Sequence, residues 1–270
     1  MFMFYLVSGG PGGSLDYVTL KGYRLLKKAD VVFYHSLFDA TALLGVCKRS
    51  CDRISVRTMS MDRRIAVVGG NPKKLFVELF LGDVAWFSMA QKMVDVLESK
   101  GISYEIVPGV SSVNMAVALL GRELTLPGIS QCCIVSCLAG SSVIDAQSIG
   151  KLASHNATLV VLMVHPSRLS DLKGQLLAGG VSKDTPVAVV YKASYPDQKI
   201  LRLTVDGIDG LEGDLWHSVF IVGWVLADGD VRRMVSGLPF VSNFALAEDY
   251  VQGGVETVVG TAGKTAVSVK

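Results

Sequence analysis

Three short stretches have the residue types that bind a small polar ligand through backbone atoms. Residues 8–13 (SGGPGG), the pair Gly82-Asp83 and residues 108–112 (PGVSS) each follow an apolar run. Glycine lets the backbone approach a ligand closely, and a serine at a helix start satisfies free N–H groups. In open α/β sheets, ligands bind at the carboxyl ends of strands, beside helix N-termini. An ordinary strand–turn–helix joint has the same pattern, so spacing alone leaves both interpretations open.

The third stretch predicts the most complete joint. Residues 102–107 are apolar or β-favouring and stop at a Pro-Gly pair, which is typical of a buried strand ending in a turn. Ser111 and Ser112 are preferred residues for a helix N-cap. Residues 113–120 then continue as an apolar helix, and Gly121 is placed to end it.

Nucleotide-binding motifs do not fit the first stretch. A dinucleotide-binding fingerprint requires G-x-G-x-x-G, but counted from Gly10 the third glycine falls at Leu15. The same fingerprint requires an acidic residue after the second strand, where this chain has His35 and Ser36. A P-loop is absent, and no Ser/His/Asp or Cys/His constellation is evident. The sequence therefore names no catalytic residue.

The composition limits the class of protein. The chain has 270 residues, 50% of them hydrophobic and 19% charged, which allows two globular domains with separate cores. No apolar run reaches the roughly 18 residues that a membrane-spanning helix requires, and residues 1–7 lack the basic start of a signal peptide. The formal charge of +2, without a basic run interleaved with aromatic residues, argues against nucleic-acid binding.

The cysteines and histidines indicate neither a disulfide framework nor a metal centre. The five cysteines contain no C-x-x-C motif, and Cys132 and Cys133 are adjacent. We therefore expect free thiols in a reducing cytoplasm. The four histidines are scattered without metal-ligand spacing, so no metal site is predicted.

Apolar runs alternate with amphipathic segments, which predicts an α/β protein. Residues 2–34 have the strand, Gly-rich loop, helix and strand of a βαβ unit. We expect a first domain at residues 1–121, a second at 122–235 and a tail at 236–270, which is loosely ordered from residue 252 onward; residues 41–74 have only a weak pattern. Strands are expected at residues 2–8, 31–34, 75–81, 102–107, 132–137, 158–164, 186–191, 200–205 and 218–222, and helices at residues 15–28, 89–100, 113–120, 145–154, 168–177 and 207–213.

Several of these stretches resemble the tetrapyrrole (corrin/porphyrin) methylases. PGVSS, followed by ELTLPGISQ at residues 123–131, resembles the middle of those proteins, and residues 8–13 resemble their G-A-G-P-G-D loop. YKASYPDQK at residues 191–199 is a more specific match. ELTLP together with GWVLADG at residues 223–229 resembles one branch of the family, the precorrin-4 C11-methyltransferases.

The resemblance implies a fold and a reaction. The fold is the two-domain α/β fold of the class III methyltransferases, the first domain with a mostly parallel sheet and the second with a mixed sheet. The reaction is methylation of C11 of precorrin-4 or cobalt-precorrin-4 by S-adenosylmethionine (SAM), giving precorrin-5 in cobalamin biosynthesis. The protein would be a cytoplasmic homodimer. The sulfonium is already activated, so holding donor and acceptor in line is the main requirement and a general base is not strictly demanded.

The resemblance also implies a SAM pocket between the domains. Asp83 is expected there, although a helix cap is an equally good interpretation of its position. Arg122 and Lys192 are candidates to bind the carboxylates of the tetrapyrrole. The residues expected to bind SAM are Pro11, Gly82, Asp83, Ser111, Ser112, Met163 and Ala193.

Departures from the family pattern leave alternatives open. Gly13 and His35 replace carboxylates, Val84 and Ser88 replace a proline and a glycine, and residues 139–141 replace a segment that contains an arginine. One alternative is a sister methyltransferase acting on another corrinoid precursor or on uroporphyrinogen. The other is a degenerate relative that binds SAM without turnover. The sequence does not indicate whether the substrate contains cobalt.

Overall fold

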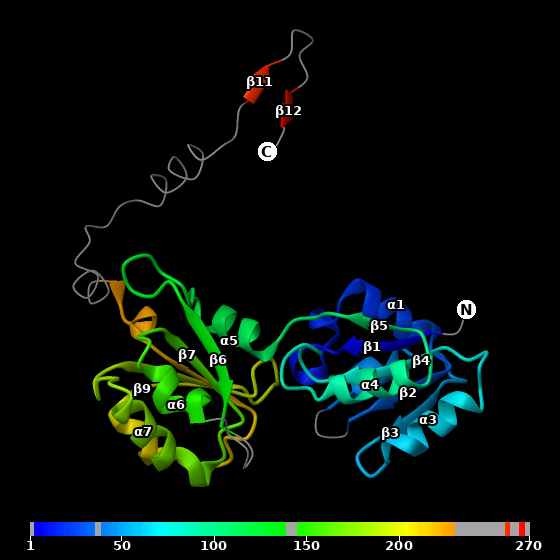
Figure 1. The fold of residues 1–270 in the computed structure, drawn as a ribbon, viewed down its shortest axis with the longest axis horizontal. Helices are drawn as coiled ribbons and strands as arrows, with labels where there is room; N and C mark the ends of the chain where they lie inside the picture. Colours follow the sequence, from blue (N-terminus) through cyan, green and yellow to red (C-terminus); the bar gives the residue numbers. More distant parts are fainter. Residues whose placement is uncertain (1–2, 36–38, 139–144, 230–256, 260–264, 268–270) are drawn as a thin grey trace.

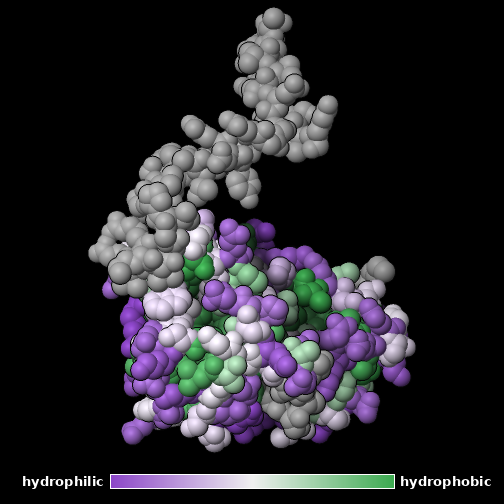
Figure 2. Space-filling view, turned by 60° about the vertical axis from the view of Figure 1, so that its left-hand side comes forward, coloured by the Kyte–Doolittle hydropathy of each residue, from purple (hydrophilic) through white to green (hydrophobic). Residues whose placement is uncertain are grey.

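Two five-stranded sheets lie side by side in the computed structural model, which describes residues 3–35, 39–138, 145–229, 257–259 and 265–267 (Figure 1). One sheet is parallel and the other mixed, so the predicted α/β class and the predicted kinds of sheet are confirmed. Hydrophilic side chains cover most of the face shown in Figure 2, and hydrophobic ones are confined to small separate areas.

The first sheet is parallel throughout and has the strand order β3-β2-β4-β1-β5. Because its strands are parallel, their carboxyl ends all meet at one edge. Its strands are β1 (Phe4–Ser8), β2 (Val31–Tyr34), β3 (Asp52–Ser55), β4 (Phe76–Phe80) and β5 (Tyr104–Val107), and its helices are α1 (Leu20–Lys28), α2 (Thr41–Gly45), α3 (Met61–Gly69) and α4 (Ala90–Ser99).

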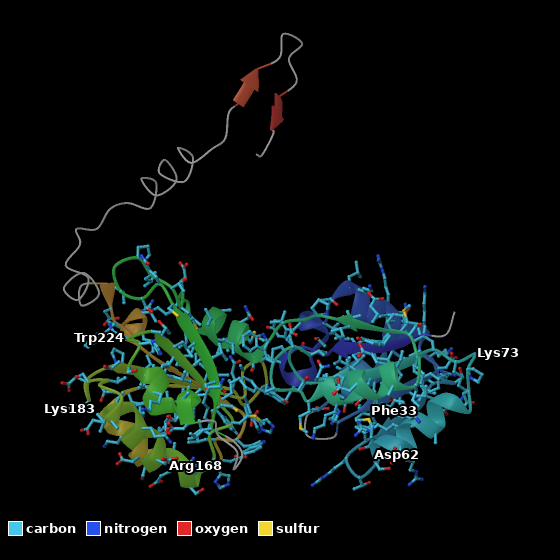
Figure 3. The ribbon with its side chains drawn as sticks, in the orientation of Figure 1. Phe33, Asp62, Lys73, Arg168, Lys183 and Trp224 are labelled. Carbon is cyan, nitrogen blue, oxygen red and sulfur yellow. The ribbon has the colours of Figure 1, made fainter. Side chains whose placement is uncertain are left out.

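Both faces of this sheet are covered, as its apolar strands require. Alternate residues of a strand point to opposite faces, so Phe4 packs with α3 and α4 while Val7 packs with α1 and α2. The rings of Phe4, Phe33 and Phe76, from three neighbouring strands, stack with centroids 6.2 to 6.3 Å apart. Phe33 lies inside this half of the molecule in Figure 3. This packing holds the strand ends in register.

The second sheet has the strand order β6-β7-β10-β8-β9; the neighbours β6 and β7 pair in parallel, and the other neighbouring pairs are antiparallel. Helices α6 and α7 pack on one face, and α5 packs on the other. Its strands are β6 (Cys133–Cys137), β7 (Thr158–Leu162), β8 (Pro186–Tyr191), β9 (Lys199–Thr204) and β10 (Ser218–Val222), and its helices are α5 (Ser112–Leu120), α6 (Ile149–Ala153) and α7 (Leu169–Ala178).

Helix α5 joins the two halves. The Oγ of Ser111 accepts a hydrogen bond from the backbone N–H of Asn114 (3.2 Å), and Gly121 ends the helix in the left-handed conformation (φ 59°), both as predicted. Although α5 follows a strand of the first sheet, Met115 and Ala116 pack against strands of the second. The boundary expected at residue 121 lies after this helix.

Three helix predictions differ from the structure. The helix expected at residues 15–28 begins only at Leu20, because Thr19 caps it through a bond from the N–H of Gly22, and residues 15–17 form a 3-10 helix instead. The helix expected at residues 145–154 is split into a 3-10 helix and α6. The one expected at residues 207–213 is a 3-10 helix. The 3-10 helices are η1 (Pro11–Gly13), η2 (Leu15–Tyr17), η3 (Asp145–Gln147), η4 (Pro166–Arg168), η5 (Val205–Gly210) and η6 (Trp224–Leu226).

The weakly patterned region, residues 41–74, contains α2, β3 and α3, which the sequence did not reveal. Strand β3 is a four-residue edge strand whose residues are exposed or half-buried, so it lacks an apolar run. At the other end of the chain, β11 (Thr257–Val259) and β12 (Thr265–Val267) pair antiparallel. The other residues from 236 onward and residues 139–141 lie outside the described residues. Within the described ranges, no helix is long and apolar enough to cross a membrane.

Candidate functional site

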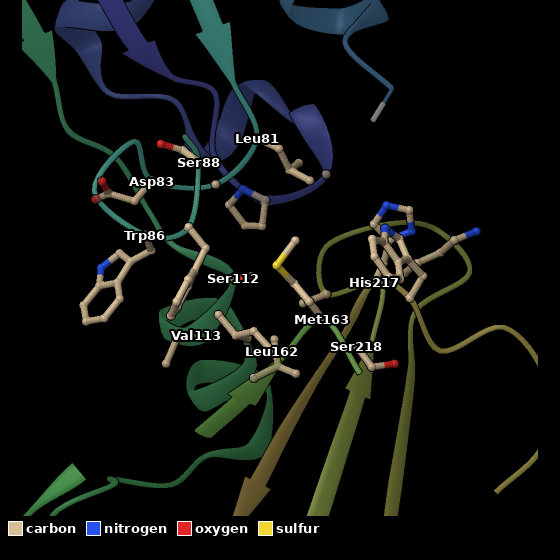
Figure 4. A pocket seen from close by; sticks show the side chains of 18 of the residues that line it. Leu81, Asp83, Trp86, Ser88, Ser112, Val113, Leu162, Met163, His217 and Ser218 are labelled. Carbon is tan, nitrogen blue, oxygen red and sulfur yellow. The ribbon is translucent and has the colours of Figure 1, made fainter. Parts of the chain in front are cut away.

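A pocket of about 270 Å³ lies where the carboxyl ends of the first sheet face the second half of the molecule (Figure 4). In that view, Asp83, Trp86 and Ser88 come from the loop after β4, whereas Met163 and His217 come from the second half. Its lining residues are Pro11, Gly12, His35, Phe80, Leu81, Gly82, Asp83, Trp86, Phe87, Ser88, Ser112, Val113, Leu162, Met163, Lys192, Ala193, Tyr195, Trp216, His217, Ser218 and Val219.

Glycine backbone forms part of the wall from the first half. Gly10 and Gly82, at the ends of β1 and β4, exchange backbone hydrogen bonds of 3.2 and 2.9 Å, and both have positive φ (71° and 67°). A Cβ on Gly10 would lie 2.8 Å from Tyr17, so only glycine fits there. Of these two glycines Gly82 lines the pocket, and the nearest atom to its Cβ position is the backbone N of Ser112 at 3.7 Å, so the wall is not crowded there.

Asp83 ties two loops together. Its Oδ1 accepts a bond from the N–H of Ala85 (2.7 Å), and its Oδ2 accepts a longer one from the N–H of Gly109 (3.4 Å). It does not cap α4: the N-cap residue is Met89, which makes no side-chain cap hydrogen bond, and the side chain that accepts from the first helical N–H is Ser88. The capping interpretation is therefore wrong for α4. Asp83 instead holds the loop after β4 against the Pro-Gly turn after β5.

Two departures from the family pattern take part in new hydrogen bonds. The N–H of Val84 donates to Ser8 Oγ (2.9 Å), which the proline of the family pattern could not do. The Oγ of Ser88 donates to the carbonyl of Val84 and accepts from the N–H of Ala90. The loop that carries Trp86 is thus fixed by this chain's own side chains.

Three residues at the wall that the second half contributes have strained backbone conformations. Met163 and Lys192 line it, Ser194 lies beside it, and all three have positive φ (56°, 46° and 76°). For residues other than glycine such conformations cost energy, and they gather at functional sites. The ammonium of Lys192 lies 2.7 Å from Asp197, and this hydrogen bond raises the pKa of Lys192. Lys192 is therefore a protonated cation at the pocket.

A hydrogen bond between Ser194 and Pro11 joins the two halves directly. The Oγ of Ser194 donates to the carbonyl of Pro11 (2.7 Å). A Cβ on Gly12 would lie 2.5 Å from that same Oγ, so the glycine permits the close approach. The Gly-rich loop and the YKASYPDQK segment, which the sequence singled out separately, meet at this bond.

Ser218 brings a buried hydroxyl to the pocket wall. Its side chain is 3% exposed, it lines the pocket, and its Oγ makes no hydrogen bond within the described part of the chain. A buried hydroxyl without a partner costs roughly 1–3 kcal/mol. The hydroxyl is thus an unused hydrogen-bonding group at the pocket wall.

The structure brings most of the predicted site residues together. Ser111 does not line the pocket, because its buried side chain caps α5. Arg122 also lies outside the lining and is 3.8 Å from Asp228. The predicted residues that line the pocket are Pro11, Gly82, Asp83, Ser112, Met163, Lys192 and Ala193.

Sequence reasoning missed several lining side chains. Trp86 and Trp216 are 46% and 39% exposed, and His217 follows Trp216 directly. A tryptophan three residues after Asp83 was a usable signal for the first of them. Trp216 and His217 precede β10, and the sequence offered no motif there.

Comparison with known proteins identifies the family. The family model of the tetrapyrrole (corrin/porphyrin) methylases matches residues 3–209. The cobalt-precorrin-4 C(11)-methyltransferase of Priestia megaterium is 30% identical over 250 residues, covering 89% of this chain and 96% of its own. That of Methanocaldococcus jannaschii is 34% identical, covering 82% and 87%.

Solved structures agree with this assignment. An X-ray structure of a cobalt precorrin-4 methyltransferase has a TM-score of 0.80 at 30% identity, covering 84% of this chain and 96% of its own. A uroporphyrin-III C-methyltransferase of Thermus thermophilus, solved with S-adenosyl homocysteine, has a TM-score of 0.70 at 27% identity, covering 84% and 94%. The chain therefore belongs to the tetrapyrrole (corrin/porphyrin) methylases.

Proposed function

We propose that this protein is a SAM-dependent methyltransferase that methylates C11 of precorrin-4, or of its cobalt form, to give precorrin-5 in cobalamin biosynthesis. The observation that carries the proposal is the pocket between the two halves, lined by most of the residues expected to bind SAM. Relatives at 30% and 34% identity over most of the chain act on cobalt-precorrin-4 at C11, by their names, which supports this branch of the family.

The lining fits SAM chemically. Gly82 has no side chain to fill the pocket, the hydroxyl of Ser218 is unpaired within the described residues, and Met163 and Val219 offer apolar surface to an adenine ring. SAM supplies a methyl group on a positively charged sulfur, and the protein contributes mainly by holding donor and acceptor in line, which is worth on the order of 7–11 kcal/mol. Lys192 is the cation placed to meet a carboxylate of the tetrapyrrole.

The first experiment tests which tetrapyrrole the protein methylates and at which carbon. We expect methyl-labelled SAM plus precorrin-4, or its cobalt form, to give a product one methyl group heavier with the label on C11. Uroporphyrinogen III should remain unmethylated in the same assay. Label on a different carbon would identify a sister methyltransferase. SAM binding without transfer to any tetrapyrrole would identify a relative that binds the donor without turnover.

Donor binding can be tested separately. Calorimetry on EDTA-treated protein should show binding of both SAM and S-adenosylhomocysteine, because the proposed site uses backbone and small side chains and no metal. Within the described ranges, no group of three or more metal-ligating side chains is present. An absence of heat with either ligand would contradict the proposal. We also propose a cytoplasmic homodimer, for which light scattering on the purified protein should give twice the mass of 28.8 kDa.

A further inference from the structure

A carboxylate is buried in the middle of the first sheet. Glu78 lies on β4, the central strand, and is 1% exposed; its neighbours across the sheet are Leu6 and Phe33. An isolated ionised carboxylate in such a place would be very costly. Glu78 therefore requires partners, and the described part of the chain supplies Arg64 and His35, of which His35 lines the pocket.

Both partners contact the same oxygen. The Nη1 of Arg64, from α3, lies 2.8 Å from Glu78 Oε1, and the Nε2 of His35, at the end of β2, lies 3.2 Å from it. The other oxygen, Oε2, is buried and has no partner within the described residues. The arginine is a permanent cation and forms an ion pair with Glu78, and a carboxylate in an ion pair can only accept hydrogen bonds.

This contact fixes the state of the histidine. Because Glu78 can only accept, Nε2 of His35 carries a proton, and in the neutral ring the lone pair is then on Nδ1. His35 lines the pocket with a side chain that is 31% exposed, and its ring packs 5.4 Å from that of Phe80. Nδ1 has no hydrogen-bond partner within the described part of the chain.

Methyl transfer to a ring carbon releases a proton. The carbon forms a bond to the methyl group with the electrons of its double bond, and the sulfur–methyl bond breaks with its electrons remaining on sulfur. In metal-free precorrin-4 the positive charge that develops on a ring nitrogen as the methyl group arrives is lost with the N–H proton of the macrocycle. A basic group at the pocket would accept that proton.

We propose that His35 accepts this proton at Nδ1, and that Glu78, held by Arg64, is a positioning residue that acts through His35. The proposal rests on the proposed function, since it assigns a role within the same reaction. It gives this chain a proton acceptor at a position where the family pattern has a carboxylate.

The other ionisable groups of the pocket are less suited to the role. Both oxygens of Asp83 already accept backbone hydrogen bonds, and Lys192 is held protonated by Asp197. His217 packs 6.5 Å from the ring of Tyr195 and has no carboxylate beside it within the described residues. Of these groups, His35 alone combines a free ring nitrogen with a buried carboxylate behind the ring.

The first experiment removes the imidazole of His35 by mutation and then adds free imidazoles to the assay. His35→Ala should lower the rate of methyl transfer about 10²-fold or more, as expected for loss of proton transfer. SAM affinity by calorimetry should stay the same. Added imidazoles should restore the rate, and more basic ones should restore more of it. His217→Ala is the matched control: its rate of methyl transfer should not rise with the basicity of the added imidazole. A full rate in His35→Ala, or a loss that no imidazole restores, would overturn the proposal.

The second experiment tests the role of Glu78. Glu78→Gln keeps the size of the side chain and loses the charge, so it should slow transfer in the wild-type background and change little in His35→Ala. Equal losses in both backgrounds would show that Glu78 acts only on stability and would overturn its positioning role. Wild-type protein is assayed first: if it methylates no tetrapyrrole, the proposed function fails, whereas a full rate in His35→Ala rejects only the role of His35.

Discussion

Single polar atoms decide much of the chemistry of this pocket, and Ser218 is the clearest case. Its buried hydroxyl has no partner within the described residues, so the protein gains nothing from it without a ligand. Ser218→Ala should leave the melting temperature of the ligand-free protein unchanged or slightly raised. SAM affinity should fall about 5- to 10-fold, which corresponds to one hydrogen bond of about 1–1.5 kcal/mol.

Calorimetry and thermal denaturation of the same preparation would check this expectation. Ser136→Ala, in β6, is a matched control because that serine is absent from the pocket lining. If Ser218→Ala binds SAM as tightly as wild type, the hydroxyl has no role in donor binding.

Asp83 combines a structural and a binding role at the scale of one side chain. Asp83→Asn keeps the acceptor for the N–H of Ala85 but places an amide near the N–H of Gly109. Since the Gly109 contact is long, the loss of stability should be near 1 kcal/mol, at the low end for such bonds. SAM affinity should fall about ten-fold because the loop that carries Trp86 shifts. Asp16→Asn, an exposed carboxylate in η2, is the control, and equal affinities in all three proteins would refute a role at the site.

At the scale of one helix, Ser111 and Ser112 have separable roles. Ser111 caps α5 and does not line the pocket, whereas Ser112 lines the pocket and does not cap. Ser111→Ala should lower the free energy of unfolding by about 1 kcal/mol, as loss of an N-cap does, and leave SAM affinity unchanged. Ser112→Ala should do the reverse. Denaturant unfolding and calorimetry on both variants would show whether the two effects separate in this way.

The sequence predicted elements well where burial is complete. Strand β4 is buried at every position and reads as an apolar run despite Glu78, so it was found within one residue at each end. The exposed edge strand β3 has no such run. Residues 15–17 look like the start of a helix, but the hydroxyl of Thr19 sets the true start of α1 at Leu20.

The site was predicted only where it depends on local sequence. Glycine and serine motifs at strand ends act through their own backbone, so their spacing was informative. The contacts of Glu78 with His35 and Arg64 join residues 43 and 14 positions apart. Such contacts depend on the order of strands in the sheet and the placement of α3, which no local motif encodes.

At the scale of the whole molecule, the tryptophans report on ligand binding. Trp86 and Trp216 line the pocket from opposite halves, whereas Trp224 lies in the second half on the side remote from the first (Figure 3). A bound tetrapyrrole should quench the fluorescence of the first two strongly and that of Trp224 weakly. Titration of wild type and of the Trp86→Phe/Trp216→Phe variant would measure this. Equal quenching in both proteins would place the tetrapyrrole elsewhere.

The packing of α5 on the second sheet determines where this protein can be divided into soluble fragments. A fragment that begins at residue 122 would lack α5 and leave Val160, Ala188 and Ile221 uncovered, so we expect it to aggregate. A cut in the turn at residues 108–110 keeps the helix with the strands that it covers, and the two pieces expressed together should remain in solution. Neither piece alone should bind SAM, since each contributes only one wall of the pocket. Gel filtration of both fragment pairs would decide where this chain can be divided.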